Sequence, residues 1–144
     1  MQVLSFVLIE ERGKFLLIQE ASSKNKGKWY LPGGKMEKGE SPAHAAQRET
    51  REEAGCGVKV KGIFCLKYYP KSIVKEKLHI YYSGRIISRR LKKKADKDSL
   101  AAAWFSYKEI RSLPLRDNLL ELLAIYKKSR KRMLPAGNFI FTES

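Results

Sequence analysis

The sequence predicts one α/β domain, and three observations lead to this fold class. The chain has 144 residues, which is enough for a single domain of ordinary size. Its first third contains short apolar runs, separated by turn residues, that have the length typical of β-strands. Two other segments carry the capping residues or the apolar spacing of α-helices. We therefore expect one core, with any functional site in a cleft or on its surface.

The first elements are expected to be strands. Apolar runs over Val3–Glu10 and Lys14–Glu20 flank the turn Glu11–Gly13, which predicts a β-hairpin. Trp29–Leu31 is expected to be a short strand, because a proline follows it and cannot donate to a sheet. The Gly33–Gly34 pair comes next and permits backbone conformations that other residues avoid.

The clearest helix signal lies between Ser41 and Gly55. Ser41 is a good N-cap residue, and the proline after it has the φ angle of a first helical residue. Gly55 suits the left-handed residue that follows a helix. We predict a helix over Pro42–Ala54. Small residues form one stripe along it, which favours close packing on a sheet: Ala43, Ala46, Thr50 and Ala54.

The second half is expected to add strands and one more helix. Val58–Tyr69 and Leu78–Ile87 are predicted to be long strands, whereas Ser99–Phe105 suits a strand or a helix. Leucines at helical spacing predict an amphipathic helix from Asn118 to about Arg130, ended by Pro135. We assign residues 1–132 to the domain and residues 133–144 to a C-terminal tail that packs on it or is loosely attached.

The composition bears on where in the cell the protein is found. Apolar runs such as Phe6–Ile9 are far shorter than the roughly 20 residues of a membrane span, and the N-terminus lacks the pattern of a secretory signal. A cytoplasmic protein without membrane contact is expected. The chain has two cysteines, Cys56 and Cys65, which we expect to be reduced and buried.

The charge is large and unevenly distributed. A net charge of +15 attracts phosphate-bearing partners, which include nucleotides and RNA. The segment Gly34–Cys56 nevertheless carries a charge of −1, which leaves +16 on the rest of the chain. An acidic segment within a basic protein suits a site that holds cations and receives a polyphosphate. A solvated helix face is the alternative interpretation.

Three glutamates, Glu49, Glu52 and Glu53, share one side of the predicted helix and repel one another. Two interpretations explain how that repulsion is relieved. The neighbouring Arg48 and Arg51 neutralise part of the charge, or divalent cations bind there. Mg²⁺ and Mn²⁺ suit clustered carboxylates that are completed by water and substrate phosphate.

The same segment contains fixed residues at fixed spacing: Gly34, Glu40, Arg48-Glu49, Glu52-Glu53 and Gly55. This pattern resembles the signature of the Nudix (MutT-like) hydrolases: Gly, five residues, Glu, seven residues, Arg-Glu, an aliphatic position, any residue, Glu-Glu, any residue, Gly and an aliphatic position. Every charged and glycine position matches, while the aliphatic positions hold Thr50 and Cys56. The preceding segment Trp29–Gly34 also looks like the family's usual lead-in.

The resemblance implies an α/β/α sandwich with a mixed β-sheet. It also implies Mg²⁺- or Mn²⁺-dependent hydrolysis of a nucleoside diphosphate linked to another group, with water attacking phosphorus. Within the family pattern, Glu49, Glu52 and Glu53 match metal-binding glutamates, and the Gly34 carbonyl is a further candidate ligand. Arg48 matches the residue that orients a glutamate.

The remaining roles follow the same resemblance. Glu40 matches the residue that steadies the loop. The general base is Glu52 or Glu49, because Ala101 stands where many relatives have a glutamate before a tryptophan. An acidic residue of a later loop is the alternative base, and three are available: Glu76, Asp96 and Asp98.

Three stretches are similar to one branch of the family, the hydrolases of oxidised guanine nucleoside diphosphates such as 8-oxo-dGDP. They are Leu17–Ala21, Lys94–Trp104 and Leu113–Arg116. The leading hypothesis is therefore hydrolysis of a nucleoside di- or triphosphate, with an oxidised nucleotide as one candidate. Aromatic residues are candidates to stack on its base, or are plain core: Phe6, Tyr30 and Trp104.

Two alternatives remain open. The positive charge outside Gly34–Cys56 favours RNA 5′ ends or dinucleoside polyphosphates as substrates, and the basic runs Arg89–Lys94 and Lys127–Arg132 are either RNA contacts or solvated surface. The second alternative is a catalytically silent module that binds nucleotides or RNA. The intact set of glutamates argues against it.

Overall fold

A β-hairpin begins the fold. In the computed structural model, which describes residues 1–72, 75–140 and 142, strands β1 (Gln2–Glu11) and β2 (Lys14–Gln19) are joined by a tight turn. Arg12 and Gly13 have φ angles of 50° and 76°, and positive φ angles at both positions give the turn a twist that matches that of paired strands. The hairpin predicted from the sequence is confirmed. The two strands pair only beside the turn and then diverge.

Strand β1 lies in the middle of the larger part of the sheet. It pairs in parallel with β6 (Lys77–Ser88) and antiparallel with the short β4 (Gly33–Lys35). Strand β6 pairs antiparallel with β5 (Gly57–Tyr69), whose outer edge is joined by β8 (Leu134–Pro135) in the C-terminal tail. Parallel and antiparallel pairs occur together, so the sheet is mixed, as expected.

Strand β2 organises the other part of the sheet. One of its edges pairs with β3 (Trp29–Tyr30), and the opposite edge pairs with β7 (Ala101–Ser106). The short helix α2 (Tyr107–Ile110) follows directly, and its N-terminus carries a capping box made by Ser106 and Glu109.

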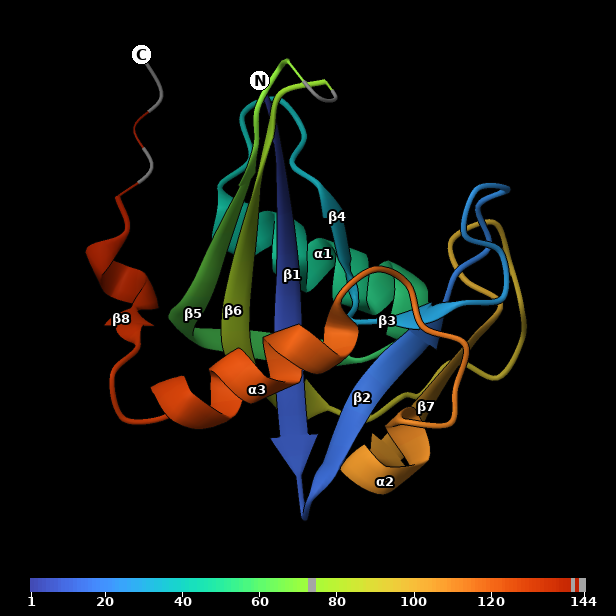
Figure 1. The fold of residues 1–144 in the computed structure, drawn as a ribbon. Coiled ribbons are helices and arrows are strands. Elements are labelled where there is room, and N and C mark those ends of the chain that lie inside the picture. The colour runs from blue at the N-terminus through green and yellow to red at the C-terminus, as the bar shows by residue number, and fades with distance from the viewer. Residues whose placement is uncertain (73–74, 141, 143–144) are drawn as a thin grey trace.

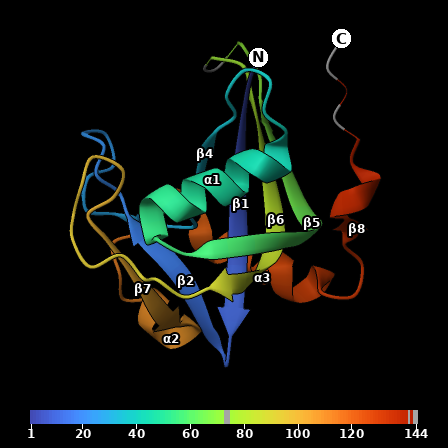
Figure 2. The ribbon, with the colours of Figure 1, turned by 180° about the vertical axis from the view of Figure 1, so that it is seen from behind.

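Two helices cover opposite faces of the sheet (Figures 1 and 2). Helix α1 (Pro42–Ala54) has the bounds predicted from its caps, and α3 (Leu119–Ser129) lies on the other face. Alternate residues of β1 serve the two cores: Phe6 and Leu8 belong to the cluster under α3, whereas Val7 and Ile9 belong to the cluster under α1. The α/β/α sandwich is confirmed.

Some details differ from expectation. The segment from Ser99 is a strand rather than a helix, and it begins at Ala101. Helix α3 ends at Ser129, next to the predicted end at about Arg130, and Pro135 lies beyond it in β8. Cys56 is buried, but Cys65 is only partly buried because it lies on the edge strand β5; both thiols are free. Within the described residues, no helix combines the length and the apolar character needed to cross a bilayer.

Candidate active site

Helix α1 is fixed at both ends. At its N-terminus, the His44 N–H donates to the Ser41 Oγ at 3.1 Å. At its C-terminus, Gly55 has a φ of 79° and returns its N–H to the Arg51 carbonyl. The loop between β6 and β7 then binds the last turn, since the Ser99 hydroxyl donates to the Glu53 carbonyl at 2.6 Å. The side chains of this helix are therefore held in position relative to the sheet.

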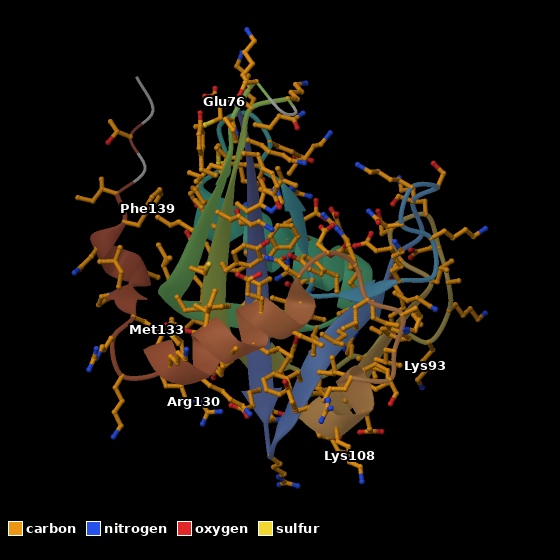
Figure 3. The ribbon with its side chains drawn as sticks, in the orientation of Figure 1. Glu76, Lys93, Lys108, Arg130, Met133 and Phe139 are labelled. Atoms are coloured by element: carbon orange, nitrogen blue, oxygen red, sulfur yellow. The ribbon has the colours of Figure 1, made fainter. Side chains whose placement is uncertain are left out.

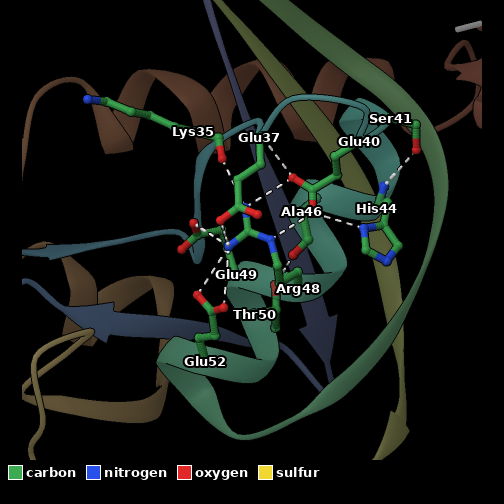
Figure 4. A network of polar contacts seen from close by, with 10 residues as sticks. All are labelled: Lys35, Glu37, Glu40, Ser41, His44, Ala46, Arg48, Glu49, Thr50 and Glu52. Atoms are coloured by element: carbon green, nitrogen blue, oxygen red, sulfur yellow. Dashed lines mark hydrogen bonds and ion pairs between the residues drawn. The ribbon is translucent and has the colours of Figure 1, made fainter. Parts of the chain in front are cut away.

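Arg48 and Glu40 form a two-pronged ion pair within this frame (Figure 4). The Arg48 Nε donates to Glu40 at 2.7 Å and the Nη2 donates at 3.1 Å. The Glu40 carboxylate also accepts the Glu37 N–H at 3.0 Å and contacts the His44 Nδ1 at 2.9 Å. Chiefly through the hydrogen bonds from Arg48, the pKa of Glu40 is lowered to about 2. This pair ties the loop before α1 to the helix.

The other side of the Arg48 guanidinium faces the glutamates of the signature. Its Nη1 donates to Glu49 at 3.0 Å and to Glu52 at 3.2 Å, so one positive charge lies between two carboxylates. Its Nη2 donates to the Lys35 carbonyl at 3.0 Å. Of the two arginines considered above, Arg48 thus offsets the repulsion, while Arg51 forms no ion pair within the described part of the chain.

Glu53 occupies a different environment from Glu52. Its side chain is buried, and the Gly33 N–H donates to its Oε1 at 2.8 Å. Burial raises the pKa of Glu53 well above its ordinary value, and the nearby charge of Glu49 acts in the same direction. A buried carboxylate with a single backbone partner is therefore available on the inner side of the helix.

The glycine pair allows β4 to lie close to both neighbours. A Cβ on Gly33 would lie 2.3 Å from the Ser5 carbonyl oxygen and 2.5 Å from the Phe6 ring. A Cβ on Gly34 would lie 2.7 Å from the carboxyl carbon of Glu49. At Gly33 the close neighbours include backbone, so only glycine fits there, whereas at Gly34 the neighbour is the carboxylate of Glu49, which therefore lies directly against this backbone.

The donor set suits a hard divalent cation. Three carboxylates and nearby backbone carbonyls are the oxygen ligands that Mg²⁺ and Mn²⁺ prefer. Among residues 1–72, 75–140 and 142, however, no three acidic, histidine or cysteine side chains stand together as a finished ligand set. The Arg48 guanidinium occupies the position between Glu49 and Glu52. Binding of an ion there therefore requires these two carboxylates to turn away from Arg48.

Phe6 and Tyr30 lie together on the α3 side of the sheet. Their rings meet edge to face with centroids 5.3 Å apart, and Tyr81 stacks on Phe6 at 5.2 Å. The Arg116 guanidinium lies 4.6 Å from the centre of the Tyr30 ring and is held by an ion pair with Glu20 at 2.9 Å. Since Phe6 also contacts Gly33, this aromatic cluster borders the glycine pair.

Trp104 lies elsewhere. It is on β7 opposite Leu16 and packs against the core under α1, not with Phe6 and Tyr30. It lines a hollow of about 770 Å³ near the β1–β2 turn, together with Glu11, Arg12, Lys14 and Arg89. The structure therefore brings two of the three aromatic candidates together and separates the third.

The three acidic residues of the later loops lie in different surroundings. Glu76 lies at the N-terminal end of β6, where it contacts the Tyr68 hydroxyl and the amino terminus (Figure 3). Asp96 binds Lys92 and the backbone of its own loop. The charge of Asp98 contributes to a raised pKa of Glu49, after the larger effect of burial. Of these three loop residues, Asp98 is the one whose charge helps to raise the pKa of Glu49, and its effect is smaller than those of burial and of Glu52.

Three residues near the site were not singled out from the sequence: Glu20, His79 and Arg116. Glu20 and Arg116 could have been found from the sequence, because they lie in the stretches Leu17–Ala21 and Leu113–Arg116 that carry the resemblance to one branch of the family. Their ion pair joins residues 96 positions apart, and no local pattern marks it.

Comparisons with known proteins identify the family of the chain. The family model described as the NUDIX domain matches residues 2–125. The chain is 36% identical to the human (Homo sapiens) 8-oxo-dGDP phosphatase NUDT18 over 132 residues, which is 89% of this chain and 40% of that protein. It is 32% identical to the protein of that name from Danio rerio, over 90% of this chain and 39% of the relative. The chain thus spans about 40% of the length of these relatives.

Solved structures show the same fold. A NUDIX hydrolase from Nitrosomonas europaea superimposes with a TM-score of 0.85 at 26% sequence identity, covering 98% of this chain and 97% of that one. The solution structure of the Escherichia coli ORF135 protein gives a TM-score of 0.69 at 26% identity, with 91% of each chain covered.

Proposed function

Since this chain belongs to the Nudix hydrolase family, a family of pyrophosphohydrolases, we propose that it hydrolyses a phosphoanhydride bond of a free nucleotide and that the preferred substrate is an oxidised guanine nucleoside diphosphate. The similarity to the 8-oxo-dGDP phosphatases supports the choice of substrate. One structural observation carries the proposal of catalysis. Two glutamates of α1 lie against the Gly33–Gly34 backbone: Glu53, which is buried and accepts the Gly33 N–H, and Glu49, which lies beside Gly34; Arg48 links Glu49 to Glu52.

Each residue of the site has a distinct part in the proposed reaction. Glu49, Glu52 and Glu53 would hold Mg²⁺ or Mn²⁺, with the Gly34 carbonyl as a further ligand. Bound by these residues, such an ion would supply polarisation of the phosphoryl oxygens and would make water more acidic. Glu52 or Glu49 accepts the proton of the attacking water.

Arg48 and Glu40 act through their contacts with these glutamates. Arg48 donates to both Glu49 and Glu52, so it keeps two carboxylates that otherwise repel close together until an ion takes its place between them. Glu40 holds Arg48 by two hydrogen bonds and keeps its guanidinium in one plane. Both are positioning residues, and the carboxylates of α1 are the groups that would meet the metal and the phosphate.

Incubation with Mg²⁺ and a panel of nucleoside di- and triphosphates tests this proposal. We expect release of phosphate or pyrophosphate, with highest kcat/KM for an oxidised guanine nucleotide. Glu53→Gln should retain the fold and lower turnover by at least about a hundredfold, a typical effect of losing a contact that stabilises the transition state. Glu11→Gln is the matched control, because Glu11 is an ion-paired glutamate at the remote β1–β2 turn. Unchanged turnover in Glu53→Gln would count against the assignment.

RNA 5′ ends are a second candidate substrate, and the position of one basic loop favours them. The run Arg89–Lys94 begins the loop that binds the C-terminal end of α1, and Lys93 points outward from it (Figure 3). A groove that binds several phosphates loses affinity steeply with salt. If RNA is the substrate, kcat/KM on a 5′-triphosphorylated oligonucleotide should fall much more steeply with salt than kcat/KM on a mononucleotide. Parallel slopes would exclude this candidate.

A further inference from the structure

His79 is a buried polar residue that the proposed reaction does not use. It lies on β6 and is 1% exposed. Its ring is packed between the rings of Phe6, at 5.3 Å between centroids, and Tyr69, at 4.9 Å. One ring nitrogen, Nδ1, lies 3.1 Å from the Tyr81 hydroxyl. The other, Nε2, is buried and has no hydrogen-bond partner among the described residues.

The hydrogen bonds around Tyr81 determine which nitrogen carries the proton. The Tyr30 and Tyr81 hydroxyls are 2.7 Å apart, so three groups form a chain from Tyr30 through Tyr81 to His79. If Tyr30 donates to Tyr81 and Tyr81 donates to Nδ1, both hydroxyl hydrogens are used and the imidazole proton is on Nε2. In the opposite direction, the Tyr30 hydrogen has no acceptor in the described chain and the Nε2 lone pair also stays unused. The first arrangement leaves fewer unpaired groups, so His79 presents an N–H at Nε2.

The ring is neutral at physiological pH. Burial is the main reason that the pKa of His79 is lowered to about 4, and the positive charges of Lys77 and Arg116 act in the same direction. A buried N–H without an acceptor is costly, which is why such groups in native proteins usually have a partner. The acceptor for this N–H must come from outside the described residues, and a bound ligand can supply it.

His79 belongs to the aromatic cluster that borders the glycine pair. Phe6 contacts the imidazole on one side and lies against Gly33, whose N–H binds Glu53. Arg116 covers the Tyr30 ring, and its charge acts on both His79 and Glu53. A nucleotide with its phosphates at the carboxylates of α1 would therefore have its base beside this cluster.

We propose that the Nε2–H of His79 donates a hydrogen bond to a ring carbonyl oxygen of the bound base and thereby selects oxopurines over aminopurines; this rests on the proposed function. Guanine offers such an oxygen at C6, and 8-oxoguanine offers a second at C8. Adenine presents an amino group at C6, so two donors would face each other. A site built around a hydrogen bond rejects a ligand that lacks the partner, because its own buried group then stays unpaired.

Small changes to the base of the substrate provide the test. The deoxyribonucleoside diphosphates of guanine, 8-oxoguanine and 2-aminopurine form a series, because 2-aminopurine lacks the C6 oxygen and the N1 hydrogen of guanine, and 8-oxoguanine gains an oxygen at C8 and a hydrogen on N7. Comparing guanine with 2-aminopurine probes the C6 oxygen, and comparing 8-oxoguanine with guanine probes the C8 oxygen. For wild-type protein we expect one comparison to show about a tenfold to hundredfold difference in kcat/KM. His79→Leu should abolish that difference, so that kcat/KM becomes similar for the bases with and without the oxygen.

Further variants separate hydrogen bonding from packing. His79→Gln keeps an N–H donor on a side chain of similar length and should restore part of the preference. Tyr81→Phe removes the hydroxyl that fixes the imidazole proton on Nε2 and should weaken the preference without abolishing it. Tyr69→Phe is the matched control, because it removes a hydroxyl from the other ring packed on His79 and should leave the preference intact.

Three results would overturn the proposal. Equal kcat/KM of the wild-type protein for the three bases would overturn it, and this result requires no variant to fold. An equal loss of kcat/KM on every substrate in His79→Leu would show a purely structural role. If the wild-type protein hydrolyses none of the nucleotides, the proposed function fails, and calorimetric binding of the corresponding monophosphates then decides the role of His79 alone. Equal affinity for the three monophosphates would refute it.

Discussion

Replacing Glu40 by glutamine removes one charge from the Arg48–Glu40 pair with little change in size. The pKa of Glu40 is about 2 in the folded protein, against an ordinary value of 4.5. Each pKa unit corresponds to about 1.4 kcal/mol, so the ionised carboxylate favours the folded state by about 3 kcal/mol at neutral pH. Removing one partner of a buried ion pair typically lowers the free energy of unfolding by at least about 3 kcal/mol, which agrees with this value. Because the amide oxygen still accepts one hydrogen bond, we expect Glu40→Gln to lower the free energy of unfolding by about 2 to 3 kcal/mol.

The pH dependence of this loss is the stricter test. A lowered pKa in the folded state means that the stabilisation is fully present above the ordinary pKa of 4.5 and disappears as pH falls toward 2. The difference between wild type and Glu40→Gln should therefore stay constant from pH 7 to about pH 6 and decrease to about half by pH 3. Urea unfolding followed by circular dichroism at each pH measures it.

The control for this measurement is Glu11→Gln. Glu11 also pairs with an arginine, Arg89, but the pair is exposed, so its loss should matter much less. A difference between wild type and Glu40→Gln that is the same at pH 7 and pH 3 would refute the assignment of the stabilisation to the ionised Glu40. A loss no larger than that of Glu11→Gln would refute the importance of its burial.

The remaining predictions concern the glycine pair and His79. Gly33→Ala places a methyl group against the Ser5 backbone, and should lower the free energy of unfolding by about 2 kcal/mol or more in urea titrations. Gly34→Ala meets only the movable carboxylate of Glu49, and should lower turnover with Mg²⁺ while changing stability by less than about 1 kcal/mol; the reverse order of stabilities would contradict this assignment. The pKa of His79 is lowered to about 4 from 6.5, so its stabilisation is complete above pH 6.5 and is lost, by up to about 3 kcal/mol, as pH falls toward 4. In His79→Leu, the free energy of unfolding should no longer fall in this way between pH 6.5 and pH 4. The same fall in that variant as in wild type would show that other groups cause it.

Elements with local signals could be predicted from the sequence. Helix α1 has the predicted bounds because Ser41, Pro42 and Gly55 determine its ends through contacts within a few residues. The β1–β2 hairpin is similar, since its turn is set by the residues of the turn itself. The spacing of the glutamates along α1 also follows from the helix alone, so their gathering on one side required no knowledge of the sheet.

Contacts between distant segments could not be predicted in the same way. Phe6 and Trp104 are both aromatic residues on strands, yet they belong to cores on opposite faces of the sheet. Which face a strand residue occupies depends on the register of pairing, and a shift by one residue reverses it. The pairing of Trp104 with Leu16 across β7 and β2 is absent from the local sequence. For the same reason, the chain of hydrogen bonds through Tyr81 could not be predicted from the sequence, because its members come from two strands, β3 and β6.

The position of Gly33 explains how one strand can serve both parts of the proposed reaction. Its N–H binds Glu53 on the α1 side of the sheet, while its α-carbon lies against Phe6 of the cluster on the α3 side. The carboxylates and the aromatic rings are therefore separated by little more than the backbone of β4. The divergence of β1 and β2 beyond their turn leaves β4 room to pair with β1 at this point. Under the proposed function, a change in the pairing of β4 with β1 would alter metal binding and base selection together, whereas changes confined to α1 would alter only the first.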